Sequence, residues 1–188
     1  MTLALALAII VHPVRAEPVE ALAFSPSPYL TLGATGAGAA ATAVSSARVA
    51  IGAWARWGAF ADAAPRRCYA VAQPLRADGT PDRRGGFASV AAARGGVRTL
   101  HLRLSRPRSP AALLTLDIDD RRFALVGDTV SARAPDAATD RAIVAAMRGA
   151  RIMTISTLDR AGRTMTDSYA LAGAATAIDA AALACARG

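Results

Sequence analysis

The sequence predicts a mainly β (α+β) domain: an antiparallel sandwich or open barrel of about eight short strands with two late helices. Three observations predict this fold. After residue 48, short alternating segments are separated by turn residues at intervals of about 8–12 positions. Helical periodicity occurs only near 136–148 and 174–186. The helices that would connect parallel strands are missing, which argues against a doubly wound sheet.

The clearest predicted strand lies at the centre of this pattern. Leu100, Leu102 and Leu104 alternate with polar residues, so one face of the strand is expected to be buried and the other wet. The remaining strands are expected at 54–60, 67–73, 87–93, 113–118, 121–126, 151–158 and 164–171.

Both helices carry boundary signals. Asp136 suits the start of the first helix and Gly149 suits its end. The second helix is rich in alanine, and Ile178 and Leu183 are expected to be its larger buried residues.

Residues 1–47 are predicted to be a disordered segment that is signal-like or lies upstream of the true start, and 48–188 a single β-rich domain. An apolar run at 2–11 fits cleavage after Ala16, and a second stretch at 29–47 fits cleavage after Ala47. Residues 12–22 resemble the translation of a repetitive intergenic element of some alphaproteobacterial genomes, which would place the true start downstream. The export signals predict a periplasmic or secreted protein.

The net charge is +8, and all 22 basic residues are arginine. Ala, Arg, Gly and Pro are raised together, which is typical of a GC-rich genome. Such a charge still attracts phosphate, anionic lipid or acidic sugar through a screened field.

The residues after 48 include one histidine, two cysteines, no lysine and no glutamate. Zinc sites need more ligands at fixed spacing, so no metal and no cofactor are expected. Asp117, Asp119 and Asp120 lie at one hairpin, but a calcium loop would also need a distal glutamate, so a charged turn is expected.

A hydrolase is the competing hypothesis to a non-enzymatic protein. Its triad would use His101 with an Asp and a Ser such as Ser89 or Ser105. The sequence has no Gly-x-Ser-x-Gly elbow, and His101 lies on the polar side of its strand. A solvated histidine and a protein that is not an enzyme are therefore expected.

Four arginines form a candidate anion-binding surface around the end of one strand: Arg98, Arg103, Arg106 and Arg108. A solvated face is the alternative. Aromatic residues are absent from this cluster, so no specific nucleic-acid binding is expected. The partner is unknown, and the candidates are an anionic envelope component and another envelope protein.

Cys68 and Cys185 are predicted to form a disulfide between the second strand and the C-terminal helix. They are the two cysteines of a chain with export signals, which suits an oxidising compartment. Two buried thiols that act as small hydrophobes are the alternative.

Several stretches of the chain resemble the invasion-associated locus B family of exported alphaproteobacterial proteins: 54–60, 67–74, 116–119, the strand pair after Gly149, and 169–178. The resemblance implies a mainly β, periplasmic or surface-associated protein without an established enzyme activity or cofactor. No catalytic residue carries over from it. This chain lacks the additional central cysteines of many members, and an envelope role is the safer expectation.

Overall fold

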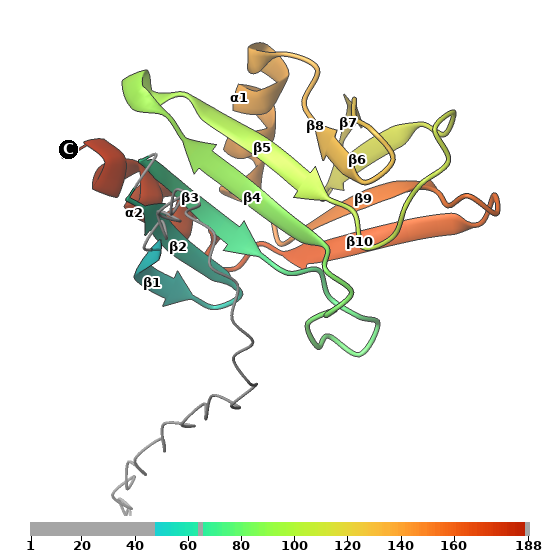
Figure 1. Cartoon of the computed structure of the whole chain (residues 1–188), viewed down its shortest axis with the longest axis horizontal. Helices are drawn as coiled ribbons and strands as arrows, with labels where there is room; N and C mark the ends of the chain where they lie inside the picture. Colours follow the sequence, from blue (N-terminus) through green and yellow to red (C-terminus); the bar gives the residue numbers. More distant parts are fainter. Residues whose placement is uncertain (1–47, 64–65, 187–188) are drawn as a thin grey trace, which may run out of the picture. The chain divides into compact units, whose positions relative to one another are not determined.

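A computed structural model describes residues 48–63 and 66–186, and within them it confirms the mainly β fold. Two antiparallel sheets and two α-helices form a β sandwich that is not closed into a barrel (Figure 1). The predictions for residues 1–47 lie outside the described residues.

The larger sheet has six strands in the order β1-β2-β3-β4-β5-β8. Consecutive strands β1 to β5 form antiparallel neighbours, and the connection between β3 and β4 is a longer loop over 73–86. The strands are β1 (Arg48–Trp54), β2 (Trp57–Asp62), β3 (Arg67–Ala72), β4 (Phe87–Ala92), β5 (Arg98–Arg103) and β8 (Ser131–Arg133).

The smaller sheet has four strands in the order β10-β9-β6-β7. Main-chain bridges join the two sheets at two places, one between Leu75 and Ser168 and one between Val126 and Arg133. The strands are β6 (Leu114–Ile118), β7 (Arg121–Leu125), β9 (Ile152–Leu158) and β10 (Thr164–Ala170).

The helices cover the apolar faces of the sheets. Helix α1 (Ala137–Met147) packs against β5, β6 and β7, and α2 (Ala174–Ala186) packs against β1 to β4. The side chain of Asp136 caps α1 by accepting a hydrogen bond from the Thr139 amide, as its sequence position predicts. Leu100, Leu102 and Leu104 are all buried, which confirms the predicted alternation.

Three sequence-based expectations are corrected by the structure. The predicted strand at 54–60 contains a turn at Ala55 and Arg56, so β1 and β2 form a hairpin there. Ala55 adopts a φ of 50°, a conformation that the sequence does not signal because glycine usually occupies it. With β1 and the three-residue β8, the described residues contain ten strands rather than about eight. Leu183 is 57% exposed because it lies on the outer side of α2, whereas Ile178 is buried.

Gly173 fixes the start of α2 against the β1–β2 hairpin. Its φ is +85°, and a β-carbon added there would lie 2.1 Å from the main-chain oxygen of Trp54. Only glycine allows this close approach of the two segments.

Candidate functional site

The four arginines of the predicted anion-binding surface do not share one surface. Arg98 lies on the same face of β5 as buried Leu100, and its guanidinium contacts the Asp179 carboxylate of α2 at 3.3 Å. Arg106 lies 3.9 Å from Asp159. Arg103 lies on the other face of β5 from Arg98 and is exposed, and it forms no ion pair with a described residue.

Arg108 cannot bind an external anion, because its side chain is a structural element of the fold. The residue is only 6% exposed. Its guanidinium donates hydrogen bonds at 2.7–3.1 Å to main-chain oxygens on two loops, those of Ser109, Pro110, Ala112, Gly127 and Asp128. The prediction is therefore corrected for Arg108, which is buried. Arg98 and Arg106 contact aspartates and Arg103 forms no ion pair with a described residue, and anion binding by these three stays a prediction.

The geometry around His101 does not support the hydrolase hypothesis. His101 lies exposed on a strand face, and its ring packs beside Phe87 with 5.8 Å between the centroids. Ser89 donates to the main-chain oxygen of His101 at 3.4 Å, not to its ring. Ser105 is buried and donates to the carboxylate of Asp167 at 2.5 Å. Among the described residues, no Ser or Asp side chain hydrogen-bonds the imidazole.

The acidic hairpin acts as a charged turn. Asp117 pairs with Arg122 at 2.7 Å, and Asp119 accepts hydrogen bonds at 3.2 Å from the amides of Arg151 and Ile152. The part of the chain that the structure describes contains no group of three His, Cys, Asp or Glu residues that is arranged to hold a metal ion.

Cys68 of β3 and Cys185 of α2 form the predicted disulfide, with their Cα atoms 5.8 Å apart. The bond fastens the last turn of α2 to the six-stranded sheet, and both cysteines line one end of the groove described next.

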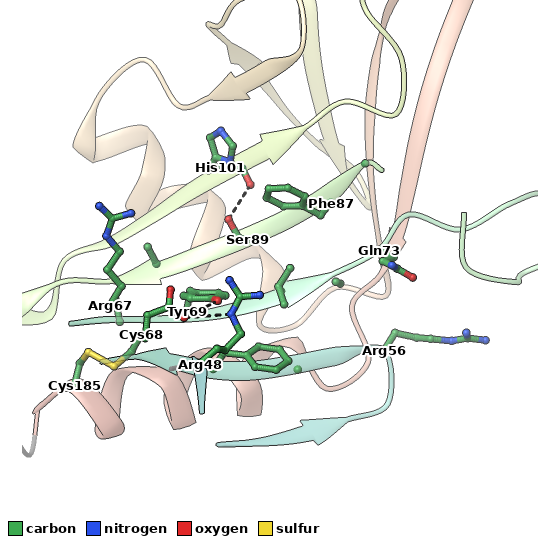
Figure 2. A pocket seen from close by; sticks show the side chains of 18 of the residues that line it. Arg48, Arg56, Arg67, Cys68, Tyr69, Gln73, Phe87, Ser89, His101 and Cys185 are labelled. Carbon is green, nitrogen blue, oxygen red and sulfur yellow. Dashed lines mark hydrogen bonds and ion pairs between the residues drawn. A yellow bond between two sulfur atoms is a disulfide. The ribbon is translucent and has the colours of Figure 1, made fainter. Parts of the chain in front are cut away.

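The outer face of the six-stranded sheet carries a groove of about 1250 Å³ (Figure 2). Strand alternation places its floor residues on the side of the sheet away from α2, because Phe60, Tyr69 and Val71 alternate with buried residues of β2 and β3. Phe87 and Ser89 of β4 extend this floor, and the small side chain of Ala91 leaves the groove open above it.

Aromatic rings occupy the middle of this outer-face groove. Phe60 and Tyr69 are register partners on adjacent strands, and their rings stack with centroids 6.0 Å apart. The guanidinium of Arg48 lies 5.9 Å from the Phe60 centroid and 5.5 Å from that of Tyr69. Burial is the main cause that raises the pKa of the Tyr69 phenol, and the nearby Asp62 carboxylate adds to it.

The charge of the groove is strongly positive. Four arginines and one aspartate line it, which gives +3 with His101 neutral. Asp62 is already engaged, since it accepts hydrogen bonds from Arg48 at 3.2 Å and from the Tyr69 hydroxyl at 3.3 Å. This bond to Asp62 also raises the pKa of Arg48, which keeps it charged.

The other groove arginines carry charges that no described carboxylate neutralises. Arg56 donates to the main-chain oxygen of Gly79, and Arg66 donates to that of Ala184. Arg67 is exposed, and among the described residues it forms no ion pair. Arg67 lies at the disulfide end of the groove, and Arg56 lies at the opposite end beside Gln73 (Figure 2). The hydrogen bond to Ala184, next to Cys185, places Arg66 at the disulfide end as well. An anionic molecule along the groove would meet positive charge at both ends.

Sequence reasoning missed this groove because its residues come from five different strands, β1 to β5, and share no motif. The one available signal was the alternation of β3, where Tyr69 and Val71 occupy the face opposite Cys68. That pattern places apolar side chains on both faces of a sheet, which indicates that the outer face is also used.

Comparison with known proteins yields a likeness of fold. No family model and no curated protein matches the sequence. The structure is similar to the crystal structure of invasion associated protein B from Bartonella henselae, with a TM-score of 0.58 and 14% sequence identity. The match covers 74% of this chain and 99% of that one.

None of the helices in the described residues has both the length and the apolar character needed to cross a membrane.

Proposed function

We propose that this chain is a non-enzymatic protein of the bacterial envelope that binds an anionic partner in the groove on the outer face of its six-stranded sheet. The groove carries the proposal: an apolar floor with aromatic rings is bordered by four arginines, and its single aspartate is engaged within the protein. Surfaces of this kind attract anions and hold them by burial of adjoining apolar groups.

Two observations support a location outside the cytoplasm. The Cys68–Cys185 disulfide is typical of proteins from oxidising compartments. The fold is similar to that of a protein whose name links it to invasion. The resemblance of the sequence to exported proteins agrees with both, and a periplasmic or secreted location is part of the proposal.

Binding to polyanions tests the proposal directly. The full chain is passed over immobilised heparin, poly-L-glutamate and phosphatidylglycerol vesicles as salt rises from about 50 mM to about 300 mM, a range over which screening strengthens markedly. We expect binding to at least one of these surfaces at low salt and its loss at high salt.

A charge-matched pair of variants separates the groove from the overall charge. Arg56→Gln/Arg67→Gln removes two exposed groove arginines, whereas Arg141→Gln/Arg160→Gln removes two exposed arginines outside the groove. The groove variant is expected to weaken binding about tenfold, since each lost contact costs roughly 0.5–1 kcal/mol. Equal effects of the two variants, or no binding to any polyanion, would overturn the proposal.

A further inference from the structure

We infer that the anionic partner of the outer-face groove is an acidic polysaccharide whose sugar rings stack on its aromatic side chains. The inference rests on the proposed function and narrows it to one class of ligand. Three features carry it: the placement of the rings, the placement of the charges, and the state of the main chain beneath the groove.

The rings form two separate platforms. Phe60 and Tyr69 make one, stacked at 28° between their planes, and Phe87 with His101 makes the other. Small or short side chains, including Ser89 and Val71, lie between the platforms. A sugar ring has an apolar C–H face that fits such a platform, and a chain of sugars repeats that face along its length.

The charges match a chain with repeated acidic groups. Strand β3 has six residues, so the groove floor is about 20 Å long at 3.3 Å per residue. Arg67 and Arg56 lie near its two ends, and Arg48 lies over the rings with 63% of its side chain exposed. One acidic group cannot reach all three arginines, whereas a polyanion that spans several sugars can.

The main chain of the floor argues against an extended peptide. Strands β2, β3 and β4 are each paired on both sides, so their amides and carbonyls are used within the sheet. An extended peptide would find no partner there for its own main-chain groups, unlike at a free sheet edge. A lipid acyl chain in an open groove would stay exposed to water on one side, which disfavours its binding. Sugar hydroxyls tolerate that exposure because they are themselves hydrated.

Binding of four probes to the full chain tests this inference by calorimetry. They are an oligogalacturonate about as long as the groove, its methyl ester, a poly-L-glutamate with the same number of carboxylates, and phosphatidylglycerol vesicles. We expect the oligogalacturonate to bind at least about tenfold more tightly than poly-L-glutamate, because it adds stacking to the same charge. The methyl ester should lose most of that affinity.

Ring variants supply the second readout. Phe60→Leu and Phe87→Leu each keep the charge and are expected to weaken oligogalacturonate binding about tenfold, with its salt dependence and poly-L-glutamate binding unchanged. Phe123→Leu on the four-stranded sheet is the matched control and should have no effect. Tyr69→Phe keeps the ring and is expected to retain binding, which guards against loss of fold as the explanation.

The outcomes separate this inference from the proposed function. If poly-L-glutamate or the vesicles bind as tightly as the oligogalacturonate and respond to the groove arginine variant, the protein binds anions but the polysaccharide inference is wrong. Equal affinity for the oligogalacturonate and for its methyl ester would show that the carboxylates are not recognised, and would overturn the inference. Failure of all four probes and of heparin at low salt overturns both.

Discussion

Arg108 shows how a single residue can serve the fold although its charge suggests a binding role. Its buried guanidinium donates hydrogen bonds to five main-chain oxygens in the loops at 109–112 and 127–128 and so holds the two loops together. The planar fork of arginine reaches several acceptors at once, which a lysine ammonium cannot do.

Arg108→Lys is therefore expected to lower the free energy of unfolding by about 2–4 kcal/mol, because a buried ammonium group replaces the guanidinium and several main-chain oxygens lose their donor. Urea unfolding followed by circular dichroism measures the effect. Arg103→Lys, at an exposed member of the same predicted cluster, should stay within about 0.5 kcal/mol of the native protein. A similar small effect at both positions would contradict a structural role for Arg108.

The four arginines of the predicted anion-binding surface also show why charges close in sequence need not share one face. Alternation along the strand places Arg98 and Arg103 on opposite faces, which could be predicted from the sequence. The partners of Arg98 and Arg106 could not, since Asp179 and Asp159 are distant in the chain. Only the folded arrangement shows which charges remain free.

At the scale of elements, the disulfide connects α2 to a strand far away in the sequence. Cys68 and Cys185 are separated by 117 residues, so their bond closes a loop that spans most of the domain. In the chain-entropy account, such a bond stabilises the protein by restricting the unfolded chain.

Cys68→Ala/Cys185→Ala is expected to lower the free energy of unfolding by up to about 4–5 kcal/mol, the value for closing a loop of this length. The variant and the oxidised protein are compared by urea unfolding, with reduction of the native protein as a second route to the same state. Coincident unfolding curves for all three forms would show that the bond contributes nothing.

The elements found from the sequence are those with a strong local pattern. The Asp136 cap, the leucines of β5 and the β9–β10 hairpin all have such patterns, and each lies within a residue or so of its predicted place. Strand β8 has three residues, too few to show a period of two. The β1–β2 turn was missed because its left-handed residue is Ala55. The groove was missed because register between strands creates it.

At the scale of the whole molecule, the pH dependence of stability follows from its aspartates. Hydrogen bonds from the Arg84 side chain lower the pKa of Asp82, main-chain amides near Arg163 lower that of Asp159, and Arg148 lowers that of Asp179. Burial raises the pKa of Asp140, which opposes this trend at one site. Acids with a depressed folded pKa stabilise the protein above their unfolded pKa, and this stabilisation is lost as the pH falls through the folded value.

The free energy of unfolding is thus expected to vary little between about pH 7 and pH 5 and to fall steadily below about pH 4, where carboxylates take up protons. Urea unfolding at several pH values measures this dependence. Asp82→Asn should reduce stability at neutral pH and make the decline at low pH shallower. Stability that rises as the pH falls towards 3 would contradict the assignment.

The position of α2 has a consequence for how the protein is made. The helix covers the apolar face of β1 to β4, yet β4 ends at Ala92 and α2 begins at Ala174. A ribosome releases the chain from its N-terminus, so the first hairpins emerge long before their cover is synthesised. The domain can close only when its last residues are present, as long-range contacts require. Until α2 is synthesised, the apolar inner face of β1 to β4 lacks the helix that covers it in the folded protein.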